Sequence, residues 1–219
     1  MYRYERKVRT YLYDSKDLIA LVKSNGASFK ESYSRRIVNS IYLDTSSHSF
    51  VEDNLDGISN RVKPRIRWYG HQENHIRDGV LELKQKKNLL GRKEKYPFGS
   101  MSLSRDSFRE QLSKNLDRLC HDNPELRFLL ELEASLMTRY TRQYFVSADH
   151  NFRVTIDTNI RYWAMSRFGR RLTNPTKDYG LTILELKYDQ NASGVDDVIR
   201  ELPLRFSKSS KYVTGVLST

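Results

Sequence analysis

The sequence predicts an α+β domain in which a mainly antiparallel sheet of about eight strands is covered by peripheral helices. Three observations support this fold class. The 219 residues contain no Pro/Gly-rich linker and no internal repeat, so residues 1–219 are expected to form one domain. Five segments alternate charged and apolar residues with the period of two that is typical of strands. Other stretches carry leucines at helical spacing instead.

The predicted strands follow one another along most of the chain. The alternating segments are 3–9, 61–69, 80–86, 152–157 and 181–189. In the second of them, one face carries Arg61, Lys63, Arg65, Arg67 and Tyr69, whereas the other carries Val62, Pro64, Ile66 and Trp68. Further strands are expected at 36–43, 140–148 and, with Lys93 and Lys95 on one face, 92–98. Tyr69 and Trp68 are candidates for stacking on a base, although Trp68 lies on the apolar face.

Helices are expected between some of these strands. Residues 15–24 carry an apolar stripe of Leu18, Leu21 and Val22. Residues 104–120 form the strongest candidate, since Ser104 can cap the N-terminus of the helix. Pro124 begins the next helix, whose inward residues are Leu126, Leu129 and Leu130. A last helix is expected at 195–202.

The composition limits the class of partner and the compartment. The chain has 38 Lys and Arg against 27 Asp and Glu, a net charge of +11, which favours a polyanion such as nucleic acid, an anionic membrane or a phosphorylated molecule. The single cysteine, Cys120, excludes an internal disulfide and is expected to be a buried apolar residue. No signal peptide and no apolar run near the ~20 residues of a membrane span are found. A cytoplasmic protein is therefore expected.

The charged strand faces have two interpretations. They can face solvent, as one side of a half-exposed sheet does. Alternatively, the strands close into a barrel whose lumen carries the charges and whose apolar faces pack under helices. Because the charges are mostly basic, such faces would repel themselves without a partner. This favours a lumen that holds a polyanion.

Eight short segments spread over residues 2–217 occur in the order of a known family. They are YERK at 4–7, SIYLDT at 40–45, KPRIRWYG at 63–70, LELKQKK at 81–87, RYTRQYF at 139–145, RVTIDTNI at 153–160, LELKYD at 184–189 and SKYVTG at 210–215. On these segments the chain resembles the catalytic domain of the vacuolar transporter chaperone (VTC) polyphosphate polymerases, in the CYTH-like triphosphate tunnel metalloenzyme superfamily. The resemblance implies a closed antiparallel eight-stranded barrel whose inner wall carries Arg and Lys.

The resemblance also implies where phosphate and metal bind. Phosphoryl transfer is assigned to Arg65, Arg67, Lys84, Arg142 and Arg153. Binding of the substrate phosphates is assigned to Lys7, Lys93, Lys95, Lys187, Lys208, Ser210 and Lys211. A divalent Mn²⁺ or Mg²⁺ is expected on Glu185, with Glu5 and Glu82 as further ligands. The broader superfamily opens with an ExExK pattern, but Arg3 replaces its first glutamate here, which argues against a generic triphosphatase or adenylate cyclase.

The implied reaction transfers the γ-phosphate of ATP to a growing polyphosphate chain or to pyrophosphate. Phosphoryl transfer depends on alignment and charge neutralisation, which arginine forks and a divalent metal supply. The alternatives are a tunnel triphosphatase that hydrolyses inorganic or nucleoside triphosphate, and a non-catalytic polyanion-binding module. Specific nucleic-acid binding is disfavoured, because the basic residues alternate with apolar ones on strands, whereas an exposed groove for nucleic acid usually mixes basic residues with aromatic stacking platforms on one face. The eukaryotic relatives carry an SPX domain and a membrane anchor, neither of which is recognised here. A separate membrane partner therefore remains open, as does the oligomeric state.

Overall fold

The computed structural model of the protein describes residues 3–72, 74–87, 90–166 and 174–219. Its strands are β1 (Arg3–Thr10), β2 (Lys30–Asp44), β3 (Asn60–Tyr69), β4 (His75–Lys87), β5 (Leu90–Ser102), β6 (Glu133–Val146), β7 (Phe152–Ala164), β8 (Thr176–Lys177) and β9 (Thr182–Asp189). Its helices are α1 (Ser15–Ser24), α2 (Ser49–Leu55), α3 (Phe108–Asp122), the 3₁₀-helix η1 (Pro124–Glu131), α4 (Val195–Arg200) and α5 (Lys211–Ser218).

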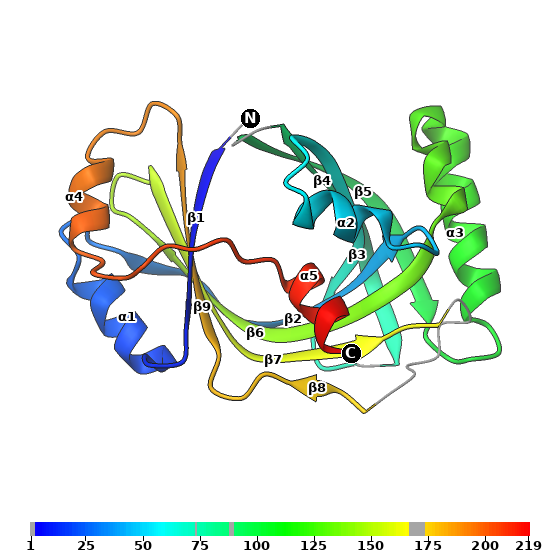
Figure 1. Cartoon of the computed structure of the whole chain (residues 1–219), viewed down its shortest axis with the longest axis horizontal. Coiled ribbons are helices and arrows are strands. Elements are labelled where there is room, and N and C mark those ends of the chain that lie inside the picture. The colour runs from blue at the N-terminus through cyan, green and yellow to red at the C-terminus, as the bar shows by residue number, and fades with distance from the viewer. Residues whose placement is uncertain (1–2, 73, 88–89, 167–173) are drawn as a thin grey trace.

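The strands close into an antiparallel ring (Figure 1). Their hydrogen-bonded order is β6-β2-β3-β4-β5-β1-β9-β7, and β7 pairs again with β6. The two-residue strand β8 adds to β7 outside this ring. The predicted α+β fold with a closed eight-stranded barrel is therefore confirmed.

The ring is joined unevenly, and its weakest junction lies between β1 and β5. β1 pairs with β9 from Arg3 to Thr10, whereas its pairing with β5 within the described ranges is limited to Arg3 opposite Gly91. Figure 1 shows β1 standing apart from β4 and β5 along most of its length. A side-chain contact crosses the gap, since Lys84 Nζ donates to both carboxylate oxygens of Glu5 at 3.0 and 2.9 Å. We refer to this junction as the seam.

The apolar faces of the strands pack under helices outside the ring, as the alternation predicts. Ile66 and Leu83 belong to a buried cluster that also holds the leucines of α3 and η1. Val154 and Leu186 belong to another, which includes Leu18 of α1 and residues of α4. Cys120 is buried, as expected. Within the described ranges, no helix has the length and apolarity that crossing a membrane requires.

Helix α5 lies inside the barrel, which the sequence did not predict. Its Tyr212 ring stacks on Tyr42 of β2 at 4.6 Å between centroids, and its hydroxyl donates to Asp44. Tyr212 shares a buried cluster with Leu136 of β6 and Tyr162 of β7. One end of the barrel interior is thus an apolar core closed by α5, and the charged side chains gather beyond it.

Two details of the predicted helices are wrong. The helix predicted at 104–120 is α3, which begins at Phe108 and not at Ser104. Its N-cap position is Ser107, whose side chain makes no capping hydrogen bond. The segment after Pro124 is a 3₁₀-helix. Because such a helix has 3.0 residues per turn, Leu126 and Leu129 share the buried face while Leu130 is 46% exposed.

The fit of α5 in the barrel gives a first testable prediction at Gly215. A methyl group on Gly215 would overlap the side chain of Leu136 and lie 2.6 Å from Tyr162. We expect Gly215→Ala to lower the free energy of unfolding by about 1–3 kcal/mol, the usual effect of overpacking a core. Gly91→Ala is the matched control, since its added methyl would meet nothing closer than 4.0 Å. Equal urea midpoints for the two variants would contradict the packing of α5 described here.

Candidate functional site

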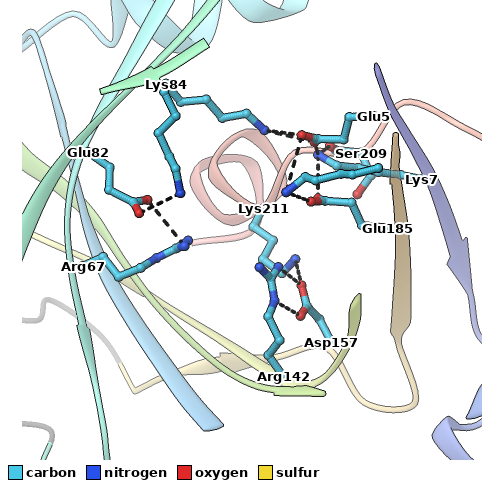
Figure 2. Close-up of polar contacts among 12 residues, drawn as sticks. Glu5, Lys7, Arg67, Glu82, Lys84, Arg142, Asp157, Glu185, Ser209 and Lys211 are labelled. Atoms are coloured by element: carbon cyan, nitrogen blue, oxygen red, sulfur yellow. Dashed lines mark hydrogen bonds and ion pairs between the residues drawn. The ribbon is translucent and has the colours of Figure 1, made fainter. Parts of the chain in front are cut away.

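Charged side chains from the strands and from α5 meet in the barrel interior, in three groups that each surround acidic residues (Figure 2). The first group surrounds Glu82 of β4, which is 2% exposed. Glu82 accepts hydrogen bonds from Arg65 at 2.9 and 2.7 Å and from Lys93 at 3.1 Å. Arg67 Nη1 lies 3.4 Å from the same carboxylate. The register explains this group, because Arg65 lies directly opposite Glu82 in the β3–β4 pair.

The second group surrounds Asp157 of β7, which is 1% exposed. Arg142 of β6, its partner in the strand register, donates to both carboxylate oxygens at 2.5 and 2.7 Å. Lys211, the first residue of α5, donates to the same carboxylate at 2.5 Å. Asp157 therefore fixes two of the predicted phosphate-binding cations and ties α5 to the wall. The sequence analysis did not single it out, although it lies on the charged face of the alternating strand 152–157.

The third group joins Glu5 and Glu185 to three lysines. Lys7 Nζ lies 2.7 Å from Glu5 and 3.6 Å from Glu185. Lys187 pairs closely with Glu185, and Lys84 reaches Glu5 across the seam. The β1–β9 register brings these side chains together by placing Lys7 opposite Glu185 and Glu5 opposite Lys187.

The lysines set the ionisation of these acids. Burial and the charge of Glu185 would raise the pKa of Glu5, but Lys84, Lys7 and Lys187 outweigh them and lower it to about 2. Burial would also raise the pKa of Glu185, but the charges of Lys187 and Lys7 outweigh it, so this pKa is lowered. The two acids therefore stay charged at neutral pH.

These shifts predict how stability depends on pH. Since the pKa of Glu5 falls from 4.5 to about 2 on folding, its contribution is complete above pH ~4.5 and is lost as the pH falls toward 2. We expect this one group to account for about 3 kcal/mol of unfolding free energy across that window. Urea denaturation at pH 5 and at pH 3 measures the loss, which should be smaller for Glu5→Gln. An unchanged slope in that variant would contradict the assignment.

The structure also brings in polar residues that the sequence analysis missed. Lys63 Nζ donates to Ser210 Oγ at 3.0 Å. Burial, together with the nearby Lys84 and Lys7, lowers the pKa of Lys63 to about 6, so this lysine is largely neutral at pH 7. Tyr42 and Tyr140 accept hydrogen bonds from the inner arginines, at 3.3 Å from Arg65 and 3.2 Å from Arg67. Tyrosines add nothing to a charge pattern, so the alternation could not reveal Tyr42 and Tyr140, whereas Lys63 was placed on the charged face of 61–69 without a role assigned to it.

Other predicted site residues lie farther out. Arg153 is exposed and lies opposite Lys187 in the β7–β9 register. Lys95 and Lys208 are also exposed. Their assigned roles remain predictions.

The interior is not the unpaired array of cations that the alternation suggested. Each of the three acidic groups holds at least two cations, so the empty barrel has less self-repulsion than expected. Arg67 is buried beside Glu82, and its removal would disturb the stability of the empty protein as well as any anion binding.

Glu5 and Glu185 have the donor chemistry for a hard divalent cation. Both carboxylates lie close to Lys7 Nζ and therefore close to each other, whereas Glu82 belongs to a separate group. Within the ranges the structure describes, no set of three His, Cys, Asp or Glu is placed to hold a metal. Mg²⁺ commonly uses one or two carboxylates and takes other oxygens from phosphate and water. The pair thus fits a metal that binds together with phosphate.

The site therefore lies inside a closed antiparallel barrel whose interior carries arginines, lysines and a few acids. The chain belongs to the VTC domain family, whose model matches residues 4–219. This confirms the resemblance found in the sequence.

Solved structures agree on the fold. The chain is similar to PH1819 of Pyrococcus horikoshii OT3, with 14% identity, a TM-score of 0.52 and 97% of each chain covered. It is also similar to a "putative adenylate cyclase" of Vibrio parahaemolyticus, with 10% identity, a TM-score of 0.56 and 98% of each chain covered. No curated protein sequence matches the chain.

Proposed function

We propose that this protein is a polyphosphate polymerase that transfers the γ-phosphate of ATP to a polyphosphate chain or pyrophosphate, with ADP as the other product. The observation that carries the proposal is the convergence of Arg65, Arg67, Arg142 and Lys211 with the lysines of the third group inside one barrel of the VTC family. Such an interior suits a long chain of phosphates better than a single small anion.

The chain's own residues would bind and align two polyanions. The forks of Arg65, Arg67 and Arg142 can each hold two phosphate oxygens, which fixes orientation as well as charge. Glu82 and Asp157 hold these forks in place before substrate arrives, so little reorganisation is needed. The terminal phosphate oxygen of the acceptor attacks the γ-phosphorus and ADP leaves, so no protein nucleophile is required.

A divalent cation, Mn²⁺ or Mg²⁺, would be held by Glu185 and Glu5. When bound it would supply charge neutralisation for the phosphate oxygens. Lys7 and Lys187 pair with these acids in the ligand-free protein and would be free to bind phosphate once the cation takes the carboxylates.

The test is incubation of the purified protein with ATP, pyrophosphate and Mn²⁺, beside Mg²⁺ and EDTA. Polyphosphate on a gel, with one ADP for each phosphate incorporated, is the expected result. Arg142→Ala should abolish the product, whereas Arg105→Ala, an exposed arginine before α3, should not. Release of phosphate without polymer would mean a triphosphatase, and binding without either product would mean a polyanion-binding module.

A further inference from the structure

Three tyrosines surround one arginine at the rim of the barrel, beyond the three charged groups. The guanidinium carbon of Arg36 lies 4.8 Å from the ring centre of Tyr33, 5.7 Å from that of Tyr69 and 5.8 Å from that of Tyr144. The rings of Tyr33 and Tyr144 also meet edge to face, with centroids 5.6 Å apart. We call these four residues the rim cluster.

The strand register places the rim cluster on the inner face of the wall. Arg36 lies opposite Arg142 in the β2–β6 pair, so the two side chains share a face. Tyr144 and Tyr69 are each two residues beyond an inner arginine on the same strand, Arg142 and Arg67 respectively. Residues two apart on a strand share a face and are about 7 Å apart. The cluster is therefore one step outward from the phosphate-binding arginines.

The position of the cluster along the barrel is opposite to that of α5. On β2, Tyr42 stacks under α5, and Arg36 lies six residues earlier on the same strand. On β6, Leu136 packs in the α5 cluster, whereas Tyr144 lies eight residues later. The rim cluster thus stands at the end of the interior that α5 does not fill.

Part of the cluster is accessible to a ligand. Tyr33 is 57% exposed and Tyr69 is 49% exposed, and Arg36 is exposed as well. In the part of the chain that the structure describes, no carboxylate forms an ion pair with Arg36. Tyr144 lies two residues after Arg142 on β6; burial raises its pKa to about 12, although Arg142 opposes that rise.

We propose that the rim cluster binds the base of a nucleoside triphosphate whose phosphates lie among the interior cations. This rests on the proposed function and adds the part of the substrate that phosphate-binding residues cannot recognise. Tyrosine rings stack on the faces of bases, and a guanidinium plane does the same. Since every base has such a face, the cluster selects a nucleotide over an inorganic phosphate chain without choosing strictly among bases.

Calorimetric titration in EDTA, which prevents metal-dependent turnover, tests this with two ligands. ATP carries a base, and inorganic tripolyphosphate does not. We expect Tyr69→Ala to raise the Kd for ATP roughly 5- to 100-fold, the loss of one stacking contact, and to change that for tripolyphosphate by less than about twofold. Tyr69→Phe keeps the ring and should keep the affinity for ATP. Tyr179→Ala is the matched control, because Tyr179 is 78% exposed and follows β8 outside the ring.

The results separate the rim cluster from the proposed function. Weakened binding of ATP alone supports the cluster as a base-binding site. Equal weakening of both ligands, or no weakening of ATP, overturns it even if the enzyme makes polyphosphate. If tripolyphosphate does not bind the wild-type protein, the proposed phosphate site is contradicted, and so is the base-binding role that depends on it. A thermal melt that shows Tyr69→Ala to be folded excludes unfolding as the cause of a lower affinity.

Discussion

Replacing Asp157 by alanine is expected to lower the unfolding free energy of the ligand-free protein by about 3–5 kcal/mol. The carboxylate is 1% exposed and holds both Arg142 and Lys211. Its loss leaves two cations in a buried place without a counter-charge, which costs more than a missing hydrogen bond. Urea denaturation without phosphate measures the change.

The control and the ligand make this prediction specific. Asp197→Ala removes an exposed pair with Arg200 and should change the free energy by only about 0–1 kcal/mol. Tripolyphosphate should restore part of the stability of Asp157→Ala, because an anion replaces the missing charge and binds the folded state alone. A larger ligand-induced rise in Tm for the variant than for the wild type is therefore expected. A small loss of stability, with no larger rise, would show that Asp157 does not organise the two cations. Asp157→Asn offers a milder change should the alanine variant fail to fold.

Glu185→Gln is expected to lower metal-dependent turnover by at least roughly 10²–10³-fold, the effect of removing one preorganised electrostatic group. The change keeps the size of a buried side chain that contacts Lys7 and Lys187. It removes one negative charge from a basic interior, so binding of tripolyphosphate without metal should be unchanged or tighter. Rates with Mn²⁺ and titrations in EDTA measure the two effects separately.

The control for Glu185 is a neighbour on the same strand. Asp189→Asn removes a pair with Arg3 at the half-buried end of β9 and should leave turnover near the wild-type value. Unchanged turnover in Glu185→Gln would mean that Glu185 serves only as an ion-pair partner of the lysines. That result would contradict the proposed metal-binding role of Glu185 and would leave the proposed phosphate-binding role of the arginines unaffected.

Much of the barrel could be predicted because alternation is a local property of each strand. The segment 61–69 separates its cations from Ile66 and Trp68, and these two faces are the inside and the outside of the wall. The pairing of Arg142 with Asp157 could not be predicted this way, because it depends on the register between β6 and β7. Periodicity fixes which side of a strand a residue faces but not which residue of the next strand lies opposite.

The position of α5 inside the barrel also could not be predicted from the sequence pattern. Helix α5 spans Lys211–Ser218, and its inward residues Tyr212 and Gly215 fit against particular side chains of β2, β6 and β7. Such a fit depends on three-dimensional shape, which a single short segment does not encode. The same segment supplied Lys211 to the predicted site, so its chemistry was visible although its place in the fold was not.

At the seam between β1 and β5, a side-chain ion pair does part of the work that backbone hydrogen bonds do elsewhere in the barrel. Among the residues that the structure describes, backbone pairing there is limited to Arg3 and Gly91, and the contact from Lys84 to Glu5 also joins the two edges. Lys84 is also one of the cations expected to bind phosphate, so a bound chain competes with Glu5 for it. We therefore expect β1 and β4 to be joined less tightly at the seam when a phosphate chain is bound, so that the circumference of the barrel depends on whether the interior is occupied.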